Sequence, residues 1–180
     1  MVYCFLADGF EELEAIAPID MLRRAGVEVV TVGVTGKSVT GSHSIIVNAD
    51  ITCDEVVFSE DIQAVILPGG MPGTLNLEKN ETVQRMLDFA ASRDIFLCAI
   101  CAAPSVFGHK GLLKGKKATA FPGFEKELEG AEIAEEYVCR DGKIITARGA
   151  GVAVKFGLEI VSALVSKEKS AEIEKTIQSL

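Results

Sequence analysis

Residues 96–104, Phe-Leu-Cys-Ala-Ile-Cys-Ala-Ala-Pro, constrain the fold more than any other stretch of the chain. An apolar run without charge ends at Cys101, and two alanines and Pro104 follow. This pattern predicts a buried strand that turns sharply into a helix, because proline is well tolerated in a first helical turn. A side chain at the tip of such a turn projects into a cleft beside the N–H groups of the new helix. Cys101 is therefore our candidate nucleophile.

Strand-like and helix-like segments alternate along the chain. Strands are predicted at residues 2–7, 27–34, 64–67, 95–100 and 117–121, with a small β excursion of 44–47 with 49–52 and a hairpin of 137–140 with 143–147. Helices are predicted at residues 12–25, 81–92, 152–165 and 167–178, with Pro18 expected near the first turns of its helix or at a kink. This alternation predicts a doubly wound α/β sandwich around a mainly parallel sheet. The 180 residues suffice for one domain over 1–180.

Composition and charge exclude several classes of protein. A net charge of −8 argues against nucleic acid or an anionic membrane as the main partner. The N-terminal apolar run turns polar after seven residues, too short for a signal peptide, and no apolar stretch approaches the ~20 residues of a membrane span. The expected location is the cytoplasm. Five scattered cysteines do not suggest a disulfide framework, and Cys4 and Cys98 are expected in the core.

Three loops should meet at the carboxyl edge of the sheet: residues 7–14, residues 68–73 and the turn at Cys101. The helix that follows Cys101 favours a thiolate and predicts a depressed thiol pKa, against the alternative of a buried, inert cysteine. Glu14 is the best carboxyl partner, and burial beside a thiolate would keep it protonated. A surface position for Glu14 stays open at this stage, whereas Glu11 and Glu12 are expected to be solvated or helix-start residues.

Gly69 and Gly70 allow a backbone N–H to approach a substrate oxygen closely. Together with the N–H of Ala102 it would form an oxyanion hole. The alternative is a plain tight turn after a strand. A phosphate-binding loop is disfavoured, because the chain has neither Gly-Lys-Ser/Thr nor a suitably spaced Gly-x-Gly-x-x-Gly.

Other cysteine chemistries fit less well. Cys98 and Cys101 form a nominal Cys-x-x-Cys, but residues three apart on a strand face opposite ways, so a redox dithiol is disfavoured. No His/Cys spacing matches a zinc site, so no metal is expected. His109 lies about 12 Å beyond Cys101 along a helix, and His43 would approach the cleft or, as we favour, be solvated. The absence of an obvious Cys–His pair weakens a protease interpretation.

Five motifs in order along nearly the full chain resemble the ThiJ/PfpI superfamily, in the branch of the Parkinsonism-associated protein deglycase. They are Gly-Phe-Glu-Glu-Leu-Glu (9–14), Asp-Met-Leu-Arg-Arg-Ala-Gly (20–26), Leu-Pro-Gly-Gly (67–70), Ala-Ile-Cys-Ala-Ala-Pro (99–104) and Arg-Gly-Ala-Gly (148–151). The resemblance implies a flavodoxin-like, class I glutamine amidotransferase-like sandwich and a homodimer, with the first helix and its Arg23 and Arg24 as the dimer surface. It also implies a Cys101 nucleophile hydrogen-bonded to a protonated Glu14, with Gly70 and Ala102 as oxyanion donors.

The same resemblance implies a cofactor-free, glyoxalase III or deglycase-type reaction on methylglyoxal-like aldehydes or their early adducts on protein side chains. The competing function is an oxidative-stress sensor or chaperone in which Cys101 is oxidised without turnover. Gly69, His43, Phe121 and Ala150 are candidate residues of the substrate pocket. At Phe121 some relatives carry His, at Ala150 some carry Pro, and near His43 some carry Arg, so substrate preference is less defined than the Cys–Glu pair.

Overall fold

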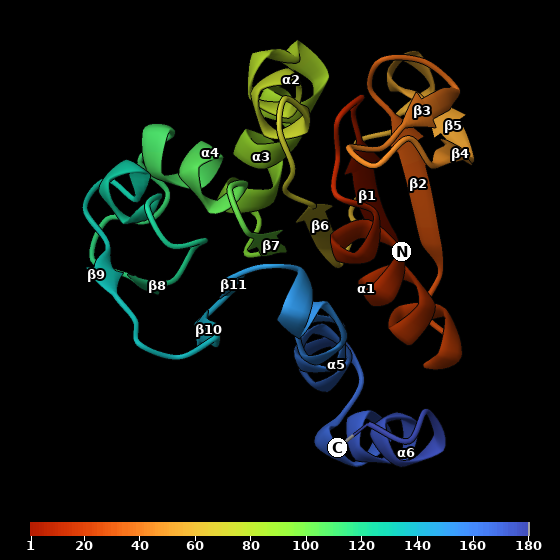
Figure 1. Cartoon of the computed structure of the whole chain (residues 1–180), viewed down its shortest axis with the longest axis vertical. Helices are drawn as coiled ribbons and strands as arrows, with labels where there is room; N and C mark the ends of the chain where they lie inside the picture. The colour runs from red at the N-terminus through yellow and green to blue at the C-terminus, as the bar shows by residue number, and fades with distance from the viewer. Residues whose placement is uncertain (180) are drawn as a thin grey trace.

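Seven strands form one central sheet in the computed structural model, which describes residues 1–179. The order across the sheet is β10-β11-β7-β6-β1-β2-β5 (Figure 1). All neighbours pair in parallel except the β10–β11 hairpin at one edge, which confirms the mainly parallel sheet. The strands are β1 (Val2–Leu6), β2 (Val29–Gly33), β5 (Ile51–Thr52), β6 (Ala64–Leu67), β7 (Phe96–Ile100), β10 (Val138–Asp141) and β11 (Ile144–Ala147).

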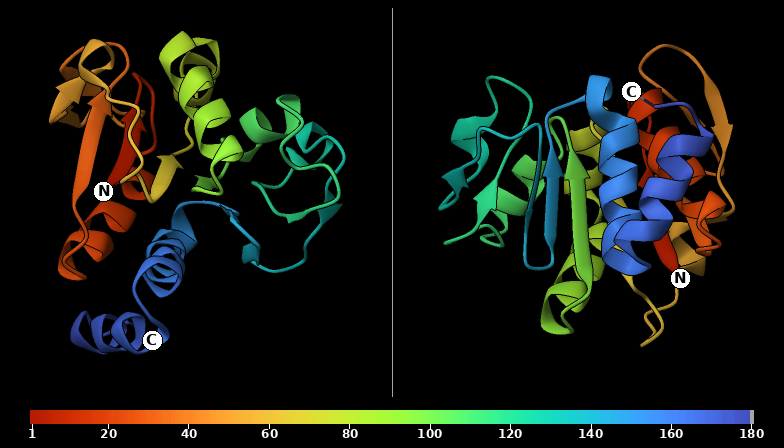
Figure 2. Two further views of the ribbon diagram at one scale, coloured as in Figure 1. Left: turned by 180° about the vertical axis from the view of Figure 1, so that it is seen from behind. Right: turned by 90° about the horizontal axis from the view of Figure 1, so that it is seen from below.

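Helices cover both faces of this sheet (Figures 1 and 2). One face carries α1 (Glu12–Arg24) and α5 (Ala153–Leu164), with α6 (Lys167–Thr176) packed against α5, and the other carries α2 (Gly73–Lys79), α3 (Glu81–Ser92) and α4 (Pro104–His109). Alternate residues of a strand point to opposite faces, so in β7 Cys98 enters one apolar core and Leu97 the other. The doubly wound sandwich is therefore confirmed.

Capping and apolar spacing explain where α3 forms. The Asn80 side chain accepts a hydrogen bond from the Val83 N–H at 3.1 Å, and so satisfies a donor that the first turn leaves unpaired. Four residues at helical spacing then face the core: Val83, Met86, Leu87 and Ala90. The sequence placed this helix correctly.

The structure corrects the sequence prediction in four places. The predicted strand 117–121 is only β8 (Lys117–Ala118), which pairs with β9 (Glu132–Ile133) outside the central sheet. In the β excursion, β3 (Ser38–Thr40) pairs with β4 (Ile46–Asn48), while β5 joins the central sheet. The helix α2 is absent from the predicted helices, because its start is rich in glycine, a poor helix former. Pro18 lies in the interior of α1, where it has no N–H to donate to the Glu14 carbonyl.

The path of the chain determines where the loops converge. From β1 the chain moves to β2 and β5 on one side, and later fills the other side with β6, β7 and β11. The loops after β1 and β6 therefore meet where the strand order reverses, the usual ligand position in such sheets.

Short 3₁₀ turns occur at Cys53–Glu55, Glu125–Glu127 and Ala150–Val152. Within residues 1–179, no helix has both the length and the apolar character needed to cross a membrane.

Candidate functional site

Cys101 occupies a strained turn between β7 and α4. Its φ is 65°, a left-handed conformation that residues with a side chain rarely adopt. Two backbone hydrogen bonds hold this conformation: the Cys101 N–H donates to the Ala147 carbonyl at 2.9 Å, and the Phe121 N–H donates to the Cys101 carbonyl at 2.8 Å. Pro104 begins α4, as predicted. The half-buried thiol is thus presented at the tip of a sharp turn.

Glu14 lies beside this thiol. It sits on the inner face of α1 with 1% of its surface exposed, so the surface position left open by the sequence is wrong. The Gly69 N–H donates to Glu14 Oε2 at 3.0 Å, and the Ala150 N–H also donates to the carboxyl. A hydrogen bond joins the Glu14 and Cys101 side chains. The structure therefore brings together the carboxyl and the sulfur that the sequence paired.

The glycines of the 68–73 loop permit this close approach. A Cβ atom on Gly69 would lie 2.6 Å from both Cys101 Cβ and Glu14 Oε2. Gly70 has a φ of +91°, and a Cβ there would lie 2.4 Å from the Glu11 nitrogen. The N–H groups of Gly70 and Ala102 both donate to the Cys101 sulfur. The loop thus supplies one N–H to the sulfur and, through Gly69, one to the carboxyl, and Ala102 supplies the second N–H to the sulfur from the turn after β7.

The electrostatics of the pair correct one prediction. Burial is the main cause that raises the pKa of Glu14 from 4.5 to about 7, and the nearby charge of Glu11 adds to it. Burial, and after it the charge of the Glu14 carboxylate, raise the pKa of Cys101 to about 12, so the predicted depressed thiol pKa is wrong. The N–H groups of Ala102 and Gly70 act in the opposite direction. Repulsion prevents both groups from being ionised together, so the pair loses its first proton near pH 7 and retains the other above that pH.

Glu11 and Glu12 have structural roles at the start of α1. Glu11 is the N-cap, and its carboxylate accepts the Glu14 N–H at 2.8 Å. Glu12 is 6% exposed and is the first residue of α1, so of the two expected positions it takes the helix start and is not solvated. It accepts the His43 N–H at 2.7 Å and pairs with His43 Nδ1 at 2.9 Å, which holds its pKa near 2 despite the cost of burial.

His43 is exposed, as we favoured, and anchors loop 41–45 to α1. The ligand atoms of Glu11, Glu12 and His43 lie within 4.8 Å of one another. Both carboxylates already accept protein hydrogen bonds, which accounts for this grouping without a metal ion.

A hollow of about 460 Å³ lies next to the Cys101–Glu14 pair. Phe121, 47% exposed, and Ala150 contribute to its lining. Gly69 does not line this hollow, and its N–H donates to the Glu14 carboxyl. A Cβ on Gly149 would lie 3.7 Å from Glu14 Oε1 and 3.2 Å from the Phe121 ring, so a side chain here would occupy the space between the ring and the carboxyl. The complete lining is Phe121, Pro122, Tyr137, Arg148, Gly149, Ala150, Gly151 and Val152.

The remaining predicted residues lie away from the sulfur. His109 bridges Glu78 at 2.6 Å and Glu127 at 2.9 Å, and neither histidine forms a hydrogen bond with Cys101. Cys4 and Cys98 are fully buried, as predicted. Sequence reasoning missed two supports of the pair, the Phe121 N–H and the Ala150 N–H, because backbone donors leave no pattern in side-chain chemistry.

Comparison with known proteins gives concordant matches. The family model described as the DJ-1/PfpI family matches residues 1–163. Protein DJ-1 homolog B of Arabidopsis thaliana is 40% identical over 173 residues, which are 94% of this chain but 39% of that protein. Deglycase TK1284 of Thermococcus kodakarensis is 30% identical over 88% of this chain and 95% of its own length. The structure of oxidized Toxoplasma gondii DJ-1 superposes with a TM-score of 0.94 at 34% identity, covering 98% and 97% of the two chains.

Proposed function

This chain belongs to the DJ-1/PfpI family, and we propose that it is a cofactor-independent, cysteine-dependent glyoxalase or deglycase. Its substrates would be methylglyoxal-type aldehydes or their early adducts on protein side chains. The observation that carries the proposal is the buried Glu14, with a pKa raised to about 7, hydrogen-bonded to Cys101. The similarity to a protein named a deglycase supports the same class.

The reactive form has the shared proton on Glu14 and the negative charge on Cys101. Burial is the main cause that raises the thiol pKa, and a neutral Glu14 removes the second cause, the repulsion, and donates its hydrogen bond to the sulfur. The N–H groups of Gly70 and Ala102 then stabilise the thiolate. A carboxyl with a pKa near 7 is also suited to accept and return a proton at neutral pH.

The proposed reaction converts methylglyoxal and water to lactate. The Cys101 thiolate adds to the aldehyde carbon, and the resulting alkoxide takes the proton of Glu14 to give a hemithioacetal. The Glu14 carboxylate then removes the hydrogen from that carbon, and the neighbouring ketone carbon receives a proton through the enediol. The product is a lactoyl thioester of Cys101. Water cleaves it and restores the thiol. Gly70 and Ala102 stabilise the oxyanions.

The hollow beside Phe121 and Ala150 would receive the rest of the substrate. Its wall is mainly apolar and glycine-rich, and Gly149 and Ala150 of this wall lie beside the Glu14 carboxyl. An exposed aromatic ring suits a small carbonyl compound or an aldehyde adduct on an extended side chain. No metal or cofactor is required by the proposed steps.

Lactate formation from methylglyoxal tests the proposal. Wild type should form lactate above the uncatalysed rate, Cys101→Ala should abolish it, and Glu14→Gln should lower it by about a hundredfold, within the range for lost general acid–base catalysis. Cys98→Ala is the matched control, because Cys98 is buried in β7 away from the sulfur. Equal lactate formation by wild type and Cys101→Ala would contradict the enzyme.

A second function, an oxidative-stress sensor or chaperone, is favoured by one contrast among the cysteines. Cys101 is half-buried and faces backbone donors, whereas Cys4 and Cys98 are fully buried. The two N–H groups that would stabilise an oxyanion would also stabilise a cysteine sulfinate. Absence of lactate together with a mass gain of two oxygens at Cys101 under mild peroxide would support this function.

We further propose that residues 1–180 act as one domain, in the cytoplasm, and as a homodimer through α1. Leu13 and Ile16 on this helix are 60% and 43% exposed. Both apolar cores share one sheet, which supports a single folding unit. Light scattering after gel filtration should report a dimer, and Leu13→Glu should weaken it.

A further inference from the structure

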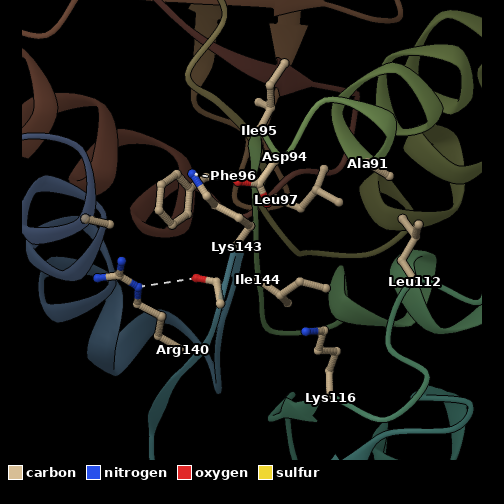
Figure 3. Close-up of a pocket in the computed structure, with 12 residues that line it drawn as sticks. Ala91, Asp94, Ile95, Phe96, Leu97, Leu112, Lys116, Arg140, Lys143 and Ile144 are labelled. Carbon is tan, nitrogen blue, oxygen red and sulfur yellow. Dashed lines mark hydrogen bonds and ion pairs between the residues drawn. The ribbon is translucent and has the colours of Figure 1, made fainter.

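A cavity of about 650 Å³ lies at the end of the sheet opposite Cys101 (Figure 3). It is formed by the first residues of β7 and β11, including Phe96 and Ile144, whereas Cys101 follows the last residue of β7. The five residues of β7 span about 17 Å, so a small molecule here cannot reach the sulfur. The volume falls within the range of small-molecule sites.

Three basic side chains from two segments line one part of this cavity. Arg140 and Lys143 flank the turn of the β10–β11 hairpin, and Lys116 precedes β8. Asp94 is the one carboxylate among the lining residues, so the lining carries a net positive charge in a chain of net charge −8. Asp141 and Glu159, which pair with Lys116 and Arg140 from outside the lining, partly offset this charge, so the attraction for an anion acts mainly within the cavity.

The basic groups are held in place but loosely paired. Lys143 Nζ and the Arg140 guanidinium lie 4.3 Å and 5.2 Å from the centroid of the Phe96 ring, which orients both over one aromatic surface. Their polar contacts are long: Lys143 pairs with Asp94 at 3.5 Å, and Arg140 donates to Glu159 at 3.4 Å and to the Gly142 carbonyl at 3.5 Å.

Lys116 is also loosely paired, since its carboxylate partner Asp141 lies 3.8 Å away. That aspartate already accepts the Lys117 N–H at 2.9 Å. Elsewhere the pairs Arg24–Asp20 and Lys110–Asp88 are both 2.8 Å. Because their contacts are longer than these, the remaining donors of the three cationic groups are available to a ligand.

The other part of the cavity is apolar. Leu97 and Ile144 are almost fully buried at its base, and Leu112 and Ala91 form the side away from the hairpin (Figure 3). An inorganic anion would contact only the basic part. A ligand with both an apolar body and an anionic group would use the whole surface.

We propose that this cavity is a second ligand site, which binds a small organic anion with an aromatic or aliphatic body. Arg140, Lys143 and Lys116 contact its carboxylate or phosphate, and the body lies on Leu97, Ile144 and Leu112. The site is independent of the reaction proposed for Cys101.

Fluorine NMR titration with 4-(trifluoromethyl)benzoate tests this assignment, with 4-(trifluoromethyl)benzyl alcohol as the uncharged control. Saturable binding of the benzoate, weakened by added salt and much weaker for the alcohol, is expected. The dissociation constant should rise about tenfold in Lys143→Gln and in Arg140→Gln, as expected for loss of a charged hydrogen bond. Ala91→Phe should block binding by filling the cavity without changing a charge. 4-(Trifluoromethyl)phenyl phosphate distinguishes phosphate from carboxylate preference.

Lys175→Gln on α6 is the matched control and should bind as wild type does, and circular dichroism should show that each variant is folded. Cys101→Ala should also bind normally. No saturable binding, equal binding of the uncharged alcohol, or unchanged affinity in both Lys143→Gln and Ala91→Phe would overturn the assignment.

Discussion

Replacing Glu14 by glutamine should remove a loss of stability that the wild type undergoes as the pH rises. The carboxyl is 1% exposed, and burial raises its pKa from 4.5 to about 7. In the unfolded chain the group returns to its ordinary pKa. Between these two values the folded protein therefore retains a proton that the unfolded chain has released.

This additional proton determines the sign and size of the effect. A folded state that binds more protons loses stability as the pH rises, so the free energy of unfolding should fall from pH 4.5 to about 7 and remain lower above it. At about 1.4 kcal/mol per pH unit, the loss amounts to about 3 kcal/mol. The position of the proton within the Glu14–Cys101 pair does not matter, because linkage counts the protons that the pair binds. Glutamine has no such proton.

Urea denaturation of both proteins at several pH values between 4.5 and 8 measures the effect. The free energy of unfolding of Glu14→Gln minus that of wild type should increase by about 3 kcal/mol across this range. A constant cost of placing an amide NH₂ opposite the Ala150 N–H cancels in this comparison. Glu28→Gln, at an exposed position, should show no such trend. Parallel pH profiles for wild type and Glu14→Gln would refute the reasoning.

Three further outcomes are expected. Gly69→Ala should destabilise the fold by about 1–3 kcal/mol in urea, because the new Cβ meets two side chains at 2.6 Å, and an unchanged midpoint would contradict the packing. Two carboxylates raise the pKa of His109, so the stability it adds is complete below pH 6.5 and is lost as the pH rises through the raised value; His109→Gln should therefore be less stable than wild type at pH 5.5 and equal to it at pH 9. Iodoacetamide on the native protein should label Cys101 but not the fully buried Cys4 or Cys98, as peptide mass spectrometry would show.

The long, regular segments could be predicted from sequence because their patterns are local. In 81–92 the apolar residues recur at helical spacing, and Asp141-Gly142 is a turn signal between the two strands of a hairpin. Both patterns can be recognised directly in the sequence. Short elements escaped this reasoning. The glycines at the start of α2 give no helix signal. The strand β8 is only two residues long and pairs with the distant β9 rather than with the central sheet.

The sequence by itself determined the alternating sandwich and the turn that presents Cys101, since both follow from apolar runs bounded by small residues and proline. Only the tertiary structure decided how that sulfur is ionised. Burial of Glu14 against Cys101, the converging N–H groups of Gly70, Ala102 and Ala150, and the shared proton depend on loops that are distant in sequence. A pKa is a property of the surrounding atoms and charges, and these are assembled only when the chain folds.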